Sequence, residues 1–367
     1  MGLADRMNNL GTESAFEVLA KARALEAKGL DIVHLEIGEP DFETPAHIVD
    51  QALRAIREGF THYGPAAGLP ELRESIAKNV NQTRGIRIEP DQVVVTPGGK
   101  PIIFFTILAL AQPGDQIMCP NPSFPIYESM INFCGAEAVP IRLMEDEGYH
   151  LDLDDMAAKL SDRTKLVILN SPQNPAGCIM TKKELDIVAG LLEERDDVYV
   201  LSDEIYKDII YDGEHSSIAS YPHMLDQTII LDGFSKSFAM TGWRLGYGIF
   251  PKWMVPHIVK LTANSVSCAA SFTQIAAISA LEGSQEPVKE MVAEFRRRRD
   301  LIVKGLRGIR GIQCPEPEGA FYVFPSIRDT GISSMEFQER ALKEAGVALL
   351  SGDSFGKYGE GYVRLSY

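Results

Sequence analysis

Cysteine is scarce in this sequence and follows no paired spacing. Among 367 residues there are five cysteines, widely separated and with no C-x-x-C pair: Cys119, Cys134, Cys178, Cys268 and Cys314. An odd, scattered set does not form the disulfide framework of a small secreted protein, and no histidine stands near them at a zinc-ligand spacing. We therefore expect reduced, mostly buried thiols and no metal site.

Positive charge and long hydrophobic runs are also lacking. Lysine and arginine number 36 against 51 aspartates and glutamates, which gives a net charge of −15. A surface this negative repels nucleic-acid phosphates and anionic lipids. The first residues contain no apolar core of a secretion signal, and no stretch reaches the roughly 18 apolar residues of a membrane helix. The sequence predicts a cytoplasmic protein that binds neither nucleic acid nor membrane.

The composition and the pattern that are present indicate a two-domain globular protein. Apolar residues make up 45% of the chain, and its length suggests two domains at roughly 150 residues each. Seven short strand-like runs alternate with helical segments: Val93–Thr96, Gln116–Cys119, Ala138–Ile141, Leu166–Leu169, Val198–Leu201, Thr228–Leu231 and Leu245–Phe250. Parallel strands need crossover connections. We expect an α/β domain with a mainly parallel seven-stranded sheet and helices on both faces.

The two ends of the chain predict a second, smaller α+β domain. A helix over Ala15–Lys28 precedes a short strand, Ile32–Glu36, and its apolar side is expected to carry Phe16, Leu19, Ala20, Ala24 and Ala27. Near the other end we predict a long charged helix at Pro287–Leu306. A strand at Ala320–Phe324, a helix at Ser334–Ala345 and a strand at Tyr362–Ser366 follow it. We divide the chain into 1–46 and 286–367 for the small domain and 47–285 for the large domain.

One predicted strand runs directly into a small-residue turn. Val93–Thr96 is followed by Pro97-Gly98-Gly99-Lys100 and then by an apolar helix. Small residues let the backbone approach an anion, and a helix N-terminus directs free N–H groups at it. The sequence therefore predicts a phosphate cradle. It matches neither G-x-x-x-x-G-K-[ST] nor G-x-G-x-x-G, so it gives no support to a nucleoside triphosphate or a dinucleotide.

Two further strand ends carry an acid and a base. Asp203 follows Val198–Leu201, and Lys236 follows Thr228–Leu231. Ligands of an open parallel sheet collect beyond the C-terminal ends of its strands, so both side chains are expected in one cleft. A lysine in an apolar site can lose its proton and attack an aldehyde. For either residue alone, a Lys–Asp salt bridge is the simpler explanation.

Motifs along most of the chain resemble the class I and II aminotransferases, which are pyridoxal-phosphate enzymes of the aspartate aminotransferase fold (fold type I). They occur in the family's order: GEPDF, THYGPAAGLPELR, TPGGK, NPSFPIY, SPQNPAG, SDEIY, FSKSFAMTGWRLGYG, GAFYVFP and YVRLSY. The segment S-K-S-F-A-M-T-G-W-R-L-G is the most specific of them. The resemblance implies the fold predicted above and a pyridoxal-phosphate cofactor.

The resemblance also implies the roles of the residues around the cofactor ring. Lys236 is expected to form a Schiff base with the cofactor and then to move the proton during the reaction. Asp203 is expected to pair with the ring nitrogen, Tyr206 and Asn174 to hydrogen-bond the ring oxygen, and Phe124 to stack on the ring. We take Lys236, Asp203 and Tyr206 as catalytic.

The phosphate and the substrate have expected partners of their own. Those for the phosphate are Gly99, Lys100 (mainly through its backbone N–H), Ser235 and Arg244. Arg364 is expected to grip the substrate α-carboxylate, with Asn174 and Gly38 beside it. In this family a tyrosine at the position of Tyr63 reaches the phosphate of the neighbouring subunit, which implies a homodimer.

The expected activity is transfer of an amino group between an L-amino acid and a 2-oxo acid by ping-pong chemistry, with 2-oxoglutarate as acceptor. A carbon–sulfur β-lyase on the same fold would share Lys236, Asp203 and Arg364, and a non-catalytic binding or regulatory domain is the alternative from another class. A pocket containing Phe16, Ile37, Phe124 and Phe321 would suit an apolar substrate side chain.

Several positions depart from the family pattern. Gln173, Ala176 and Gly233 replace the common Asn, Thr and Ser, and none of them removes a central role. In relatives another helix usually follows the last motif, so a chain that stops at Tyr367 is expected to be a short or truncated form.

Overall fold

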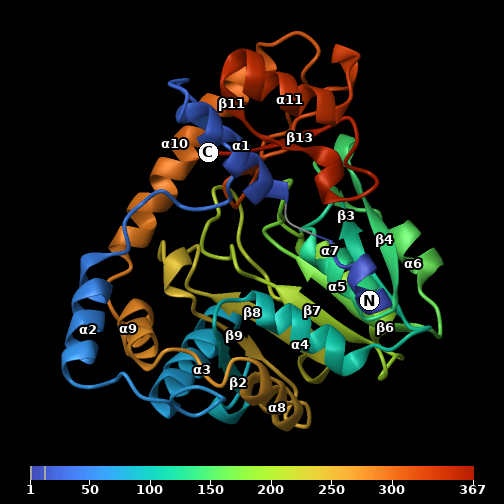
Figure 1. The fold of residues 1–367 in the computed structure, drawn as a ribbon. Helices are drawn as coiled ribbons and strands as arrows, with labels where there is room; N and C mark the ends of the chain where they lie inside the picture. Colours follow the sequence, from blue (N-terminus) through green and yellow to red (C-terminus); the bar gives the residue numbers. More distant parts are fainter. Residues whose placement is uncertain (1, 12–13) are drawn as a thin grey trace.

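The computed structural model describes residues 2–11 and 14–367, and its centre is an eight-stranded sheet (Figure 1). The strands lie in the order β2-β9-β8-β7-β6-β3-β4-β5. In chain order they are β2 (Val93–Thr96), β3 (Gln116–Asn121), β4 (Glu137–Met144), β5 (His150–Leu151), β6 (Thr164–Asn170), β7 (Tyr199–Asp203), β8 (Thr228–Gly233) and β9 (Gly246–Ile249). The five central strands β8, β7, β6, β3 and β4 are parallel. The predicted α/β class is confirmed.

The expected count of seven strands is one short. All seven predicted runs form strands, and the two-residue β5 adds an eighth at one edge, where Leu143 pairs with Leu151 and Met144 with His150. This hairpin turns through Gly148, at φ +72°, and Tyr149, at φ +67°. Two residues are too few to show an alternating pattern in the sequence, which is why the prediction missed this strand.

Helices cover both faces of the sheet. Because side chains of a strand alternate between faces, neighbouring positions such as Val200 and Leu201 point into different helical layers. One face packs against α4 (Lys100–Leu110), α5 (Ile126–Phe133) and α8 (Val255–Ser265). The other packs against α2 (Ala46–Arg57), α3 (Pro70–Arg84), α6 (Leu153–Lys159), α7 (Lys182–Leu192) and α9 (Ser271–Glu282). The sheet is therefore buried on both sides, as a parallel sheet requires.

Both ends of the chain contribute to two small sheets above the large one in Figure 1. β1 (Val33–His34) pairs in parallel with β11 (Val347–Ala348). β13 (Val363–Ser366) lies between β10 (Tyr322–Val323) and β12 (Leu350–Ser351). The long helix α10 (Glu286–Arg307) leads into this region. The small α+β part that was predicted from both chain ends is present, while its residue boundaries stay a prediction.

Helix α11 (Ser334–Ala345) begins and ends at the predicted residues because both ends carry strong local signals. The Ser333 hydroxyl accepts a hydrogen bond from the backbone N–H of Glu336 at 3.2 Å, which caps the first turn. Gly346 follows at φ +67°, a conformation that glycine adopts at little cost and that ends many helices.

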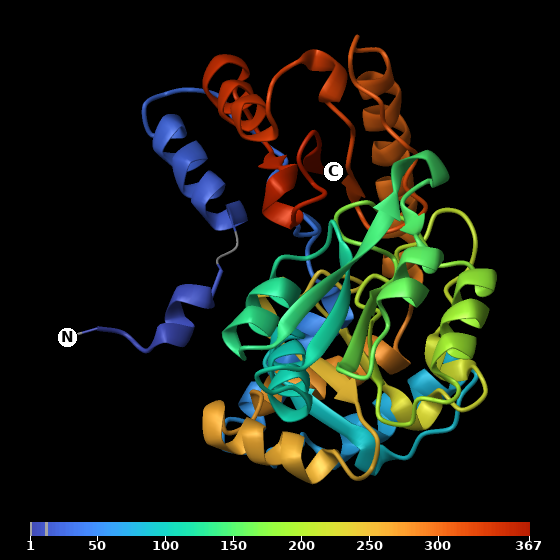
Figure 2. The same cartoon turned by 90° about the vertical axis from the view of Figure 1, so that its right-hand side faces the viewer.

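The predicted apolar side of the first helix is wrong. Helix α1 (Ser14–Glu26) buries Val18 and Ala22, whereas Phe16 is 60% exposed. Apolar residues surround this alanine-rich helix, so the sequence allows more than one apolar stripe. Figure 2 shows residues 2–11 and α1, in blue, along one side of the molecule. Among the described residues, no helix has both the length and the apolar character needed to cross a membrane.

Candidate active site

A cavity of about 580 Å³ lies beyond the C-terminal ends of β6, β7 and β8, and it also touches the small sheets. Eleven of the twelve predicted site residues line it: Gly38, Gly99, Lys100, Phe124, Asn174, Asp203, Tyr206, Ser235, Lys236, Arg244 and Arg364. They come from segments that are far apart in the sequence. The eleven residues thus lie together at the edge of the sheet where ligands of a parallel sheet collect.

One end of the cavity is built for an anion. Helix α4 starts at Lys100, directly after Gly98 and Gly99, and its first N–H groups have no acceptor inside the helix. The Arg244 side chain packs against Gly98, where an added Cβ would lie 2.5 Å from the guanidinium. Gly98 also has φ +84°, so glycine is required there for two reasons. Ser235 adds a hydroxyl to the same lining.

Asp203 is a buried acid at the end of β7. Its Oδ2 accepts a hydrogen bond from the Tyr127 hydroxyl at 2.6 Å, and its Oδ1 accepts one from the backbone N–H of Ile205 at 3.2 Å. Burial raises the pKa of Asp203 to about 6, even though these two hydrogen bonds oppose the rise. A carboxylate held this way gains from a positive partner, such as a protonated ring nitrogen.

Lys236 projects into the cavity after β8. Its ammonium donates a hydrogen bond to the carbonyl oxygen of Gly38, and it lies 5.9 Å from the centre of the Tyr206 ring and 5.5 Å from that of Phe321. The segment around Gly38 therefore crosses the cavity next to the lysine. The faces of these two aromatic rings attract the ammonium and help to orient it.

Arg364 lies at the opposite wall, on β13, and is 4% exposed. Its Nη1 donates to Oδ1 of Asn174 at 3.1 Å, and its Nη2 donates to the backbone carbonyl of Glu36 at 2.7 Å. Asn174 is itself placed by Asn170, whose Oδ1 accepts from the Asn174 backbone N–H at 2.9 Å. The guanidinium is thus held by an N-terminal segment and by the loop after β6, and it suits bidentate binding of a carboxylate.

Tyr63 is the one predicted site residue that the cavity lining of this chain does not include. It lies in the loop between α2 and α3, and its side chain is 90% exposed. A tyrosine this exposed makes no contribution to the site of its own chain.

Two tyrosines of the cavity were not predicted. Tyr127 stands one helical turn after Phe124 in NPSFPIY, a spacing that could have placed it beside the same site. Tyr322 lines the cavity where Phe321 was expected, and the Phe321 ring stacks on Phe295 with ring centres 5.0 Å apart. Ala320 has φ +56°, and this bend in the backbone before Phe321 is not visible in the sequence.

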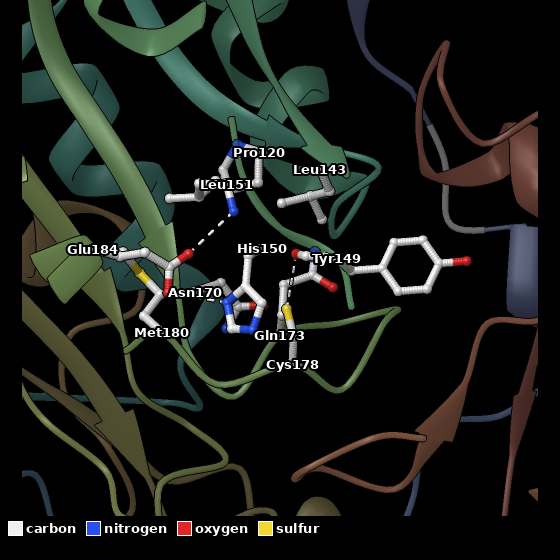
Figure 3. A pocket seen from close by; sticks show the side chains of 10 residues that line it. All are labelled: Pro120, Leu143, Tyr149, His150, Leu151, Asn170, Gln173, Cys178, Met180 and Glu184. Atoms are coloured by element: carbon white, nitrogen blue, oxygen red, sulfur yellow. Dashed lines mark hydrogen bonds and ion pairs between the residues drawn. The ribbon is translucent and has the colours of Figure 1, made fainter. Parts of the chain in front are cut away.

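A second, much smaller cavity lies beside the first (Figure 3). Its volume is about 10 Å³, which is room for no more than one water molecule. Glu184 lines it and accepts hydrogen bonds from the His150 ring at 3.0 Å and from the Leu151 backbone N–H at 3.2 Å. Although burial acts in the other direction, hydrogen bonds from His150 and Thr181 lower the pKa of Glu184. This cavity has no space for a substrate.

Comparison with known proteins agrees with this geometry. The family model for aminotransferase class I and II matches residues 31–367. The chain belongs to the class I and II aminotransferase family. It is 40% identical to an aspartate aminotransferase of Pyrococcus abyssi and 39% identical to aromatic-amino-acid aminotransferase 2 of Thermococcus litoralis, in each case over all of this chain and 94% of the relative.

A solved aminotransferase structure has the same fold as this chain. The aspartate aminotransferase of Thermus thermophilus with maleate superposes with a TM-score of 0.96 at 36% identity, covering all of this chain and 95% of the other. The protein is therefore an aminotransferase, an enzyme whose family depends on pyridoxal phosphate.

The residues of the cavity fit that cofactor. The Gly98–Arg244 cradle and the α4 N-terminus suit the phosphate, and a lysine suits the aldehyde. At Asp203, a protonated ring nitrogen would offset the cost of the buried carboxylate.

Proposed function

We propose that this aminotransferase acts on dicarboxylic amino acids and 2-oxo acids, with 2-oxoglutarate as the acceptor. The main evidence is the set of positively charged side chains that line the cavity. Lys236, Arg244 and Arg364 line the cavity, and we assign them to the aldehyde, the phosphate and the α-carboxylate. Lys100 is a fourth, and its ammonium lies 5.8 Å from the centre of the Phe124 ring. A second carboxylate on the substrate would meet the Lys100 ammonium in this cavity.

Lys236 and Arg364 would have distinct roles in the reaction. Lys236 would hold the cofactor, which when bound supplies an electron sink for the bond broken at the substrate Cα. The Lys236 amine, once released, would take the Cα proton and return it to the cofactor side. Arg364 would fix the α-carboxylate with two parallel hydrogen bonds. Fixing the substrate at this end orients its Cα–H bond toward Lys236 and favours loss of the proton over loss of carbon dioxide.

Aromatic donors are a second proposed substrate class. Phe16, Ile37 and Phe124 line the same cavity as Lys100 and present apolar surface to it. The names of the relatives support both classes, because one is called an aspartate and another an aromatic-amino-acid aminotransferase. A lysine can serve both, since its long side chain covers apolar surface while its ammonium moves to a carboxylate.

Lys100→Met tests the substrate class. We expect kcat/KM for aspartate and glutamate to fall about 10- to 100-fold, because a charge-assisted hydrogen bond is lost, while that for phenylalanine changes less than about threefold. The measurement is the half-reaction, in which each amino donor is mixed with the enzyme carrying pyridoxal phosphate and no acceptor is added. The absorbance of the cofactor and the amount of 2-oxo acid are followed over time.

The matched control is Lys252→Met, an exposed lysine paired with Asp91 at 3.6 Å. An equal loss for acidic and aromatic donors in Lys100→Met would contradict the assignment of Lys100 to the second carboxylate. Ammonia and pyruvate from cysteine- or serine-like donors, with no conversion of the cofactor to its amine form, would instead indicate the β-lyase.

We also propose that the active form is a cytoplasmic homodimer in which Tyr63 completes the partner's phosphate site. Tyr63 is 90% exposed, and Leu53, Ile56 and Phe60 are exposed large apolar side chains on α2 or directly after it. Apolar residues gathered in this way usually mark a surface that another chain covers.

Complementation tests the shared site. Tyr63→Ala and Lys236→Ala chains should each be nearly inactive as pure dimers. A hybrid dimer restores one site, because the chain with Lys236 receives Tyr63 from its partner. Random 1:1 mixing makes half of the dimers hybrid, so we expect about a quarter of the parent activity. No gain above the sum of the two pure variants, or a fully active monomer, would overturn the shared site.

A further inference from the structure

Tyr322 lies among the residues of the proposed function but has no task in it. It belongs to β10, a strand of the small sheet, and it is 1% exposed. Its backbone is fixed by pairing with Ser366 on β13. A buried tyrosine normally finds a partner for its hydroxyl, so the identity of that partner is informative.

The hydroxyl of Tyr322 lies 2.7 Å from the hydroxyl of Tyr206. The two rings meet edge to face, with centres 5.7 Å apart and planes at 83°. Tyr206 follows β7 of the large sheet, so this hydrogen bond joins the two sheet regions across the cavity. Burial raises the pKa of Tyr206 well above its usual value of 10, which keeps this hydroxyl protonated and able to donate.

The ring of Tyr322 supports Arg364. The guanidinium carbon lies 4.5 Å from the centre of the Tyr322 ring and 5.0 Å from that of Phe355. Aromatic faces attract and orient a guanidinium. Tyr322 also explains the glycine at position 38, because a Cβ there would lie 2.2 Å from the Tyr322 hydroxyl oxygen. One side chain therefore contacts three segments of the site.

The direction of the tyrosine–tyrosine hydrogen bond follows from proton counting. A hydroxyl has a single proton to donate. When pyridoxal phosphate is bound, Tyr206 would donate its one proton to the ring oxygen of the cofactor. The proton between the two tyrosine hydroxyls would then come from Tyr322. A hydroxyl that accepts a hydrogen bond becomes a better donor, because chained hydrogen bonds polarise one another.

We propose that Tyr322 is a positioning residue that strengthens Tyr206 as a donor to the ring oxygen and holds Arg364 for the substrate carboxylate, so that the two ends of the site respond to each other. This inference rests on the proposed roles of Tyr206 and Arg364. Besides Tyr322, the titratable and charged groups around Tyr206 are Arg364, Asp203, Lys236 and Tyr127.

Tyr322→Phe removes the hydroxyl and keeps the ring under Arg364. Loss of one hydrogen bond to Tyr206 should raise the apparent pKa of the bound cofactor's absorbance by about half a unit to one unit. The affinity of the cofactor-free protein for pyridoxal phosphate should fall about two- to tenfold. KM for the amino donor should change less than about twofold. Tyr322→Leu removes the ring as well and should also raise KM about tenfold.

Coupling is measured with maleate, a dicarboxylate without an amino group. Bound at Arg364, it should change the apparent pKa of the bound cofactor in the parent, and this change should be at least halved in Tyr322→Phe. Tyr149→Phe is the matched control, because it too deletes a buried tyrosine hydroxyl, one that donates to the Phe324 carbonyl at 2.7 Å. Tyr149→Phe should lower the free energy of unfolding without altering the apparent pKa of the bound cofactor, either with or without maleate.

The double variant Tyr206→Phe/Tyr322→Phe separates positioning from mere packing. If Tyr322 acts through the Tyr206 hydroxyl, Tyr322→Phe adds no further pKa change in the Tyr206→Phe background. An unchanged titration in Tyr322→Phe, or equal changes in both backgrounds, overturns the proposal. Failure of the proposed function would look different, since the parent would then bind pyridoxal phosphate but show no preference for dicarboxylic or aromatic amino donors.

Discussion

Lys236→Ala should lower turnover by at least about ten-thousandfold, to the level of the uncatalysed background. The residue is proposed both to hold the cofactor and to move the proton, and loss of a group with two such tasks removes most of the catalytic effect. The fold should be little affected, because the side chain projects into the cavity, where its ammonium donates a hydrogen bond to the Gly38 carbonyl. Turnover is measured at saturating donor and acceptor, and unfolding is followed by circular dichroism.

A labelling experiment locates the attachment directly. Borohydride fixes the cofactor on the lysine that carries it, and peptide mapping should place the label on Lys236 in the parent and on no lysine in Lys236→Ala. Lys100 is the informative second lysine, because it lines the same cavity. A label on Lys100 in the parent would move the attachment there. Lys252→Ala, at an exposed lysine, should keep both label and turnover.

The predictable part of this protein is the part with repeated local signals. Parallel strands bury both faces, so runs such as Leu166–Leu169 stand out from their surroundings, and the residues that follow the parallel runs lie at the same edge of the sheet. That reasoning alone placed Asp203 and Lys236 together. The resemblance then added Arg364, which comes from the end of the chain and which no strand rule connects to the others.

The unpredictable part depends on packing between distant segments. Whether Phe321 or Tyr322 enters the cavity depends on a two-residue strand and on the positive φ of Ala320, neither of which leaves a pattern in the sequence. The face that α1 buries is set by the sheet beneath it, since the helix alone offers more than one apolar stripe. Tyr63 belongs to the same class, because its proposed partner is in another chain.

Asp203→Asn should lower kcat/KM by about a hundred- to a thousandfold, the range for loss of one electrostatic contact at a reacting group. The amide keeps the size of the side chain but has no charge with which to hold the ring nitrogen protonated. Tyr127→Phe, which only removes the hydroxyl that donates to Asp203 at 2.6 Å, should cost about tenfold. Unchanged turnover in Asp203→Asn would remove this carboxylate from the mechanism.

The same substitution should stabilise the protein when the cofactor is absent. Burial raises the pKa of Asp203 to about 6, against an ordinary value of 3.8. Between these values the folded carboxyl keeps a proton that the unfolded chain has lost, so its contribution to the free energy of unfolding falls as pH rises across this window. Above about pH 6 the ionised carboxylate lowers the free energy of unfolding by about 3 kcal/mol, because each pKa unit corresponds to about 1.36 kcal/mol. Asparagine avoids this cost but loses about 1 kcal/mol of hydrogen bonding.

The free energy of unfolding of cofactor-free Asp203→Asn should therefore exceed that of the parent by about 2 kcal/mol at pH 7, and the gain should vanish near pH 4. Urea unfolding at the two pH values measures it. Glu184→Gln is the control of opposite sign, because hydrogen bonds lower the pKa of Glu184 and its charge stabilises the fold at neutral pH. That variant should be less stable at pH 7 with its turnover number unchanged. A loss of stability in Asp203→Asn at pH 7 would mean that the carboxylate stabilises the fold. A gain in stability together with lost activity would show that the charge destabilises the cofactor-free protein and is needed for the function of the cofactor.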